Sequence, residues 1–132
     1  MNQTKKLVKT AVNYRPAFVV YRENEYELVP ELICTKKTDA DEKVEEINNR
    51  EANFFRHKSK GRYKSVMISK EESENLSNSL YVLMKKRGNT VDVMGVNKRK
   101  GFLKDMRERD RKKLNTKESE KHNYKIYRVK TK

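Results

Sequence analysis

The lysines and arginines between residues 98 and 114 are the residues whose types and spacing best suggest chemistry. Four of them follow one another at intervals of four, three and four residues: Lys100, Lys104, Arg107 and Arg111. In a helix these intervals return to one face, so the four cations fall within about 60° of one another. Such a ridge suits the phosphates of a nucleic acid backbone. Lys98 and Arg99 precede the ridge and are further candidate contacts.

The charge balance of the chain favours binding over simple solvation of this ridge. Residues 1–55 carry 9 Lys+Arg against 10 Asp+Glu, whereas residues 56–132 carry 24 against 9, so the net charge of +14 belongs to the later residues. Unneutralised charge of this size destabilises a small domain through self-repulsion. Proteins that keep such charge often bind a polyanion. The alternative is a solvated helix face that is screened by Asp105, Glu108 and Asp110.

A second basic run contains no acidic residue. Its cations are Arg56, Lys58, Lys60, Arg62 and Lys64. If the segment were extended, alternation would place all five on one side, but Gly61 favours a flexible loop. Loops of this kind bind phosphates without reading base sequence, and Tyr63 is a candidate for base stacking. The alternative is an ordinary exposed loop.

The third basic element is a strand expected at residues 124–129. Lys125 and Arg128 alternate there with Tyr124 and Tyr127. Aromatic side chains among cations on a sheet are typical of proteins that bind single-stranded nucleic acid, because the rings stack on bases. The alternative is that these tyrosines are half-buried packing residues. Apolar side chains on both faces indicate a strand that is sandwiched or central, or one that exposes its aromatic rings.

Residues that would indicate catalysis or a metal site are few. His57 and His122 are the only histidines, and neither has a Cys or His companion at metal-ligand spacing, so we expect no metal and no cofactor. Three acids that begin a predicted helix, Asp39, Asp41 and Glu42, are explained by the helix dipole. A small metal-independent nuclease needs no further motif, and Arg56, His57 and Tyr63 would be its participants.

The elements that must position these residues begin with a β-hairpin at 17–34. Its β-branched and aromatic residues favour strands, and Pro30 indicates an edge position or a break, because proline cannot donate a hydrogen bond to a neighbouring strand. A helix is expected from 38 to about 55, followed by a strand at 63–68.

A second helix is predicted after Ser69, where Ser69 and Glu72 have the spacing of a capping box. Its apolar stripe would be Leu76, Leu80, Leu83 and Met84. The cations at 85–87 suit its C-terminal end, and Gly88 suits a left-handed cap. With a strand at 91–96, these elements predict a β-α-β unit with a right-handed parallel crossover.

The predicted fold class is therefore α/β (α+β). A small mixed sheet would combine the N-terminal hairpin, the β-α-β unit and the C-terminal strand, together with about three helices. An alternative contains a helix-turn-helix, since Met94-Gly95-Val96 followed by Asn97-Lys98-Arg99 resembles the turn and recognition-helix entry of that motif. Gly101 stands where that motif requires an apolar residue, and Val91 and Val93 favour a strand.

The chain is expected to form a single domain, 1–132, without internal repeats. Residues 1–14 would be a flexible basic tail, 15–55 a near-neutral part and 56–132 a strongly basic part. Cys34 has no partner for a disulfide, and we find neither a signal peptide nor an apolar run of membrane-spanning length, so we expect a cytoplasmic protein.

Three classes of function fit the sequence. The first is a non-enzymatic nucleic-acid-binding protein, DNA- or RNA-binding, such as a phage or mobile-element regulator or accessory factor. The second is a protein-binding module or inhibitor that acts on host nucleic-acid machinery, with residues 17–34 pairing with another chain. The third is the small nuclease described above, or a protein that binds an anionic ligand.

Overall fold

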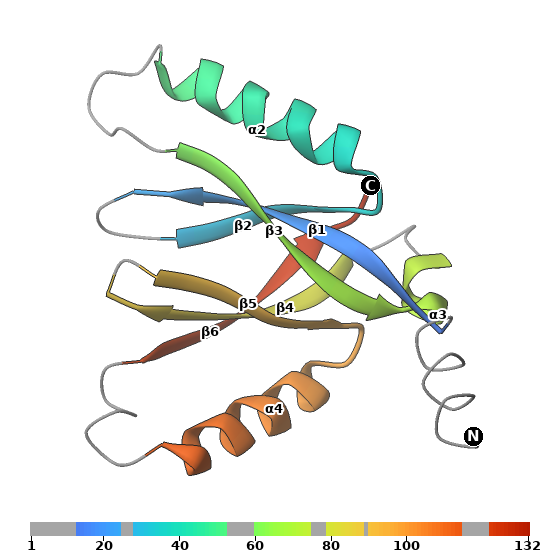
Figure 1. Cartoon of the computed structure of the whole chain (residues 1–132), viewed down its shortest axis with the longest axis vertical. Helices are drawn as coiled ribbons and strands as arrows, with labels where there is room; N and C mark the ends of the chain where they lie inside the picture. The colour runs from blue at the N-terminus through green and yellow to red at the C-terminus, as the bar shows by residue number, and fades with distance from the viewer. Residues whose placement is uncertain (1–12, 25–27, 53–59, 75–78, 89, 115–121) are drawn as a thin grey trace, which may run out of the picture.

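Two three-stranded antiparallel sheets pack face to face, and one helix covers the outer face of each (Figure 1). The computed structural model describes residues 13–24, 28–52, 60–74, 79–88, 90–114 and 122–132. Its elements are β1 (Tyr14–Glu23), β2 (Leu28–Cys34), α2 (Lys37–Ala52), β3 (Lys60–Ser69), α3 (Lys70–Glu74), β4 (Ser79–Arg87), β5 (Thr90–Asn97), α4 (Lys100–Lys113) and β6 (Asn123–Lys130). The strand orders are β2-β1-β3 in the N-terminal sheet and β5-β4-β6 in the C-terminal sheet.

The central strand of the N-terminal sheet, β1, is buried on both faces. Val19 and Tyr21 belong to the core between the sheets, whereas Val20 packs toward α2 with Ile47 and Cys34. Because side chains alternate along a strand, burial on both faces requires a continuous apolar run. This requirement explains the sequence Ala-Phe-Val-Val-Tyr at residues 17–21.

The central strand of the C-terminal sheet, β4, follows the same rule. Leu80, Val82 and Met84 enter the core between the sheets, while Leu83 is fully buried on the opposite face. The core cluster thus contains side chains of both sheets. The apolar side chains of each half of the chain are buried by those of the other half.

The two halves of the chain repeat one topology. Each runs strand, strand, helix, strand, and in each the first strand lies at the centre of its sheet. No internal repeat was expected from the sequence, and the duplication is visible only in the order of the elements. It places α2 and α4 on opposite outer faces of the molecule (Figure 1).

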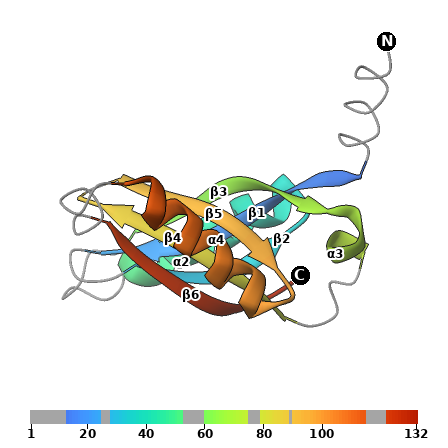
Figure 2. The ribbon, with the colours of Figure 1, turned by 90° about the horizontal axis from the view of Figure 1, so that it is seen from below.

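The sheets approach each other along two edges, with β2 beside β6 and β3 beside β5 (Figure 2). Along the first edge, the Lys132 backbone N–H donates to the Ile33 carbonyl at 2.9 Å. The Tyr127 hydroxyl also donates to the Leu28 carbonyl at 2.9 Å. Residues 17–34 were expected to pair with another chain, but within this hairpin Ile33 of β2 is already bridged to Thr131.

The predicted α+β class is confirmed, with three helices among the described residues. The hairpin at 17–34, the helices at 38–55 and 98–114, and the strands at 63–68, 91–96 and 124–129 all have counterparts. The single mixed sheet is replaced by two antiparallel sheets.

The long helix predicted after Ser69 is wrong. Within the described residues of that segment only α3 is helical, and residues 79–87, which the prediction made helical, form β4. The Ser69 hydroxyl does accept a hydrogen bond from the Glu72 N–H at 3.2 Å, so half of the expected capping box forms. The run Leu80-Tyr81-Val82-Leu83-Met84 satisfies helical spacing, but it equally satisfies a strand that is covered on both faces, and periodicity cannot separate the two.

Two further expectations fail with that helix. The β-α-β crossover does not exist, because β4 and β5 form an antiparallel hairpin. Gly88 has φ +57° at the turn of this hairpin instead of capping a helix. The helix-turn-helix alternative is also wrong. Among the described residues of 87–103, one helix begins, α4, and the residues before it form the strand β5.

Candidate functional site

The outer face of the C-terminal sheet carries α4, which docks through a narrow set of contacts. Leu103 is fully buried, and Met106 lies over Gly95, where an added Cβ would come within 3.0 Å of the methionine sulfur. Phe102 does not join these contacts and is 53% exposed. Close approach at Gly95 therefore sets the height of the helix above the sheet.

The start of α4 is held by side chains that accept backbone hydrogen bonds. The Lys98 N–H donates to Glu72 Oε1 at 2.9 Å, and the Arg99 N–H donates to Asn97 Oδ1 at 2.8 Å. Glu72 is buried, and its carboxylate reaches from α3 to the residues before α4. These bonds orient the first turn, where Lys100 lies.

The end of α4 is held by Asp110. Its Oδ2 lies 2.9 Å from Lys85 Nζ on β4, and it also accepts a hydrogen bond from the Tyr124 hydroxyl on β6. Burial alone would raise the pKa of Asp110, but the hydrogen bonds from Lys85 and Tyr124 lower it below the ordinary value. Burial and the Asp110 hydrogen bond raise the pKa of Tyr124 to about 12.

The predicted basic ridge exists and borders β6. The Arg111 guanidinium lies 5.1 Å from the centre of the Tyr124 ring, a cation–π distance. Helical spacing places Lys100, Lys104 and Arg107 along the same side of α4. Arg107 is partly buried and the other three residues are exposed.

The outward-facing residues of β6 add to this ridge. Tyr124 contacts α4, so strand alternation places Ile126, Arg128 and Lys130 on the same face of the sheet. Arg128 and Lys130 are exposed, and Arg128 Nε donates to Ser79 Oγ at 2.7 Å. We define the α4–β6 surface as Lys100, Lys104, Arg107, Arg111, Arg128 and Lys130.

Acidic side chains neutralise this surface only in part. Glu108 Oε1 lies 3.3 Å from both Arg107 Nε and Arg111 Nη1. Among the described residues, neither Lys100 nor Lys104 has an ion-pair partner. Exposed ion pairs contribute about 0–1 kcal/mol, so the two arginines can exchange Glu108 for a stronger anion at little cost.

The cations of β3 lie elsewhere. Residues 60–64 form a strand and not the expected loop, because Gly61 packs against α2 and its N–H donates to Asn48 Oδ1 at 2.8 Å. Lys60, Arg62 and Lys64 are exposed at the edge beside β5, opposite the edge formed by β6. Arg62 Nε lies 3.9 Å from Glu23 Oε2.

Other predicted site residues are also separated from the α4–β6 surface. Lys125 pairs in register with Met84, so it lies on the opposite face of β6. Lys98 is directed to Glu71, with 3.1 Å between Nζ and Oε1. Arg99 is exposed at the start of α4. Arg56, His57 and Lys58 lie outside the described residues.

The three tyrosines proposed for base stacking all make packing contacts. Tyr63 meets Phe18 edge to face, with 5.7 Å between ring centres. Tyr124 is held by Asp110 and Arg111, and Tyr127 donates to the Leu28 carbonyl. These contacts favour the packing interpretation, and β6 is sandwiched between α4 and the N-terminal sheet.

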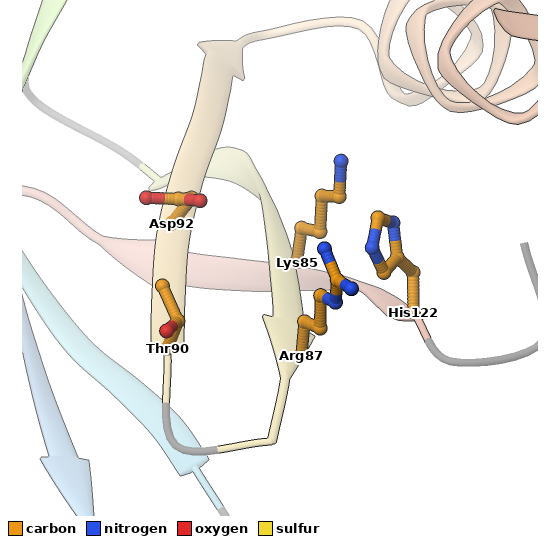
Figure 3. A pocket seen from close by; sticks show the side chains of 5 residues that line it. All are labelled: Lys85, Arg87, Thr90, Asp92 and His122. Carbon is orange, nitrogen blue, oxygen red and sulfur yellow. The ribbon is translucent and has the colours of Figure 1, made fainter. Parts of the chain in front are cut away.

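A pocket of about 230 Å³ that was not predicted from the sequence lies beyond the C-terminal end of α4 (Figure 3). Its lining residues are Lys85, Arg87, Thr90, Asp92 and His122. Lys85 and Arg87 had been assigned to a helix terminus. The dipeptide Gly88-Asn89 between two β-prone runs is typical of a two-residue hairpin turn, and it was the signal that pointed to this arrangement.

Two negative findings concern the described part of the chain. Its His, Cys, Asp and Glu side chains form no group of three that could hold a metal ion. Its helices include none that is long and apolar enough to cross a membrane.

Comparison with protein-family models, curated proteins and solved structures found no match to this chain.

Proposed function

We propose that this protein binds nucleic acid without chemical turnover, through the phosphate backbone and the α4–β6 surface. The observation that carries the proposal is the placement of six cations from two elements on one face of the molecule. A ridge on a helix alone would be consistent with solvation. The same ridge beside outward-facing cations of a neighbouring strand makes an extended positive surface of the kind that phosphates recognise.

Rigidity of the surface also supports the proposal. The residues that lead into α4 are held at Lys98 by Glu72 of α3, and the end of α4 is fixed to the sheet at Asp110 by Lys85 and Tyr124. Side chains on a fixed backbone lose less conformational freedom on binding than side chains on a mobile loop. Tyr124, the tyrosine beside this surface, packs against Arg111 and Asp110, so we expect contacts to phosphate to dominate contacts to bases.

The test is a salt-dependent titration with duplex DNA, single-stranded DNA and RNA. For about six phosphate contacts on duplex DNA, the plot of log K against log salt has a slope of about −5. A slope near zero for all three nucleic acids overturns the proposal.

Two matched triple variants locate the surface. Lys100→Glu, Lys104→Glu and Lys130→Glu change three exposed lysines of the α4–β6 surface. Lys60→Glu, Arg62→Glu and Lys64→Glu change three exposed cations of β3. Each set lowers the net charge by six, from +14 to +8. We expect the first set to weaken binding at least about tenfold and to flatten the slope by about 3.

The second set should weaken binding less than about threefold, because its charges lie at the opposite edge and salt screens them over about 8–10 Å. Equal losses for the two sets would show that net charge, and not this surface, drives binding. Circular dichroism spectra should be unchanged in both sets, because all six residues are exposed.

A further inference from the structure

The pocket beyond α4 shares the outer face of the C-terminal sheet with the α4–β6 surface. Lys85 pairs in register with Asp92, and Arg87 pairs with Thr90, so these side chains stand beside each other on β4 and β5. His122 forms the wall on the β6 side, and Figure 3 shows its ring facing the ends of Lys85 and Arg87. The pocket is therefore built from three strands or their immediate extensions and does not depend on a single loop.

His122 is the unusual member of the pocket. It is only 9% exposed, and neither Nδ1 nor Nε2 has a hydrogen-bond partner among the described residues. Buried polar atoms of this kind are rare, because an unmade hydrogen bond in the interior costs free energy. A ligand in the pocket is a natural source of the missing partner.

The charges around the pocket favour an anion. Lys85 and Arg87 are cationic, and the Asp110 carboxylate beside Lys85 is already engaged by Lys85 and Tyr124. An ammonium has three donors, so Lys85 keeps donors for a ligand after pairing with Asp110. Asp92 is the opposing charge in the lining and should weaken anion binding.

The pocket also continues the α4–β6 surface. Arg111 ends the cationic ridge over the ring of Tyr124, and that ring stands edge to face with His122 at 6.4 Å between centres. Arg111, Tyr124 and His122 thus connect the ridge with the pocket. A polyanion that follows the ridge would reach the pocket at its end.

We propose that this pocket binds one phosphate group, supplied by the end of a nucleic acid strand that lies on the α4–β6 surface. This proposal rests on the proposed function, because it requires a nucleic acid on the α4–β6 surface whose end reaches the pocket. A free phosphate or nucleotide has the same chemistry, so the experiment separates these sources. Lys85 and Arg87 provide charge, and Thr90 and His122 provide hydrogen-bond donors.

The first measurement is an NMR titration of the full chain with inorganic phosphate. The chain has two histidines, so the ring signals are assigned with the His57→Gln variant. Binding should shift the His122 signals. If saturating phosphate leaves the His122 ring signals in place, the pocket does not bind phosphate and the proposal is overturned.

The second measurement compares oligonucleotides of one sequence with a 5′-phosphate, a 3′-phosphate or neither. One terminal phosphate should improve affinity at least fivefold. Arg87→Gln should remove that gain, whereas Asp92→Asn should increase it, because the opposing carboxylate is lost. Arg109→Gln, an equal charge change on the exposed side of α4, is the control and should retain the gain.

The outcomes separate the two proposals. A phosphate-dependent shift of His122 without any oligonucleotide binding would support the pocket for free phosphate, and it would overturn both the strand-end assignment and the proposed function. Oligonucleotide binding with no gain from either terminal phosphate would overturn the pocket and leave the proposed function intact. A gain that survives Arg87→Gln would also overturn the pocket. His122→Phe, which keeps an aromatic ring but removes both ring nitrogens, provides a second variant that should lose the gain.

Discussion

Asp110 of α4 and Lys85 of β4 form an ion pair with 2.9 Å between Oδ2 and Nζ, and both side chains are about one-fifth exposed, at 22% and 18%. The Tyr124 hydroxyl of β6 donates to the same carboxylate oxygen. One carboxylate therefore joins the helix to two strands of the sheet. It also stands between the basic ridge and the pocket that contains His122, so its loss should affect both stability and the shape of the surface.

Replacing Asp110 by asparagine should lower the free energy of unfolding by about 1–3 kcal/mol, because Lys85 would keep a largely buried charge without its partner. Urea denaturation measures the change. Asp105→Asn is the control, since Asp105 is exposed and has no ion-pair partner among the described residues; its effect should stay within about 0.5 kcal/mol. Equal effects of the two substitutions would contradict the role assigned to Asp110.

The same carboxylate should contribute to acid sensitivity. The pKa of Asp110 is lower in the folded protein than its ordinary value of 3.8, so its contribution to stability is present above that value and is lost as the pH falls through the lower folded value. The stability difference between wild type and Asp110→Asn should therefore shrink below about pH 4. Urea midpoints of both proteins at pH 6 and pH 3 test this, and a constant difference would contradict it.

Tyr124 should ionise late in an alkaline titration. Its pKa is raised from 10.0 to about 12, so the folded state holds this proton more tightly than the unfolded state. The stability from Tyr124 is complete below pH 10.0 and is lost as the pH rises toward about 12. Phenolate absorbance of wild type minus that of Tyr124→Phe isolates this group. Asp110→Asn should move the transition to lower pH, and an unmoved transition would contradict the assigned hydrogen bond.

Gly61 should be intolerant of a methyl group. An added Cβ would lie 3.0 Å from both Ile47 Cβ and the Val44 carbonyl oxygen, atoms fixed by α2. Gly61→Ala should therefore cost about 1–3 kcal/mol of stability and loosen α2 from β3. Gly101→Ala is the matched control, because its added Cβ has no atom within 4 Å apart from its chain neighbours and the backbone of its own helix, and alanine favours helix. Thermal unfolding of both variants measures the difference. Equal midpoints would contradict the prediction and would mean that β3 moves away from α2 at little cost.

Several elements followed from local chemistry in the sequence. The β-prone residues around 17–34, the acidic start of α2 and the four-three-four spacing of cations on α4 each satisfy one local rule. No competing pattern occurs at those positions, so local preference and tertiary packing agree. The basic ridge could be predicted for the same reason, because its spacing depends only on helical geometry.

The helix predicted at 80–84 was wrong because two local rules fit this segment, helical spacing and a strand covered on both faces. Its side chains are apolar at every position, and the apparent cap at Ser69 and the cations at 85–87 favoured a helix. The outcome depended on whether other elements would cover both faces, as the N-terminal sheet and α4 do. Recognising Gly88-Asn89 as a hairpin turn would have corrected this segment, and with it the positions of Lys85 and Arg87.

The sequence by itself determined that the chain is a mixed α+β protein, that positive charge is concentrated after residue 55, and that one helix carries a cationic ridge. Only the tertiary structure decided which cations share a surface. Residues of β6 join the ridge because β6 lies beside β4 beneath α4, whereas those of β3 lie at the far edge. Residue type and local spacing fix the charge and the face of each element, but the distance between elements is set by long-range strand pairing and burial, which no local pattern contains.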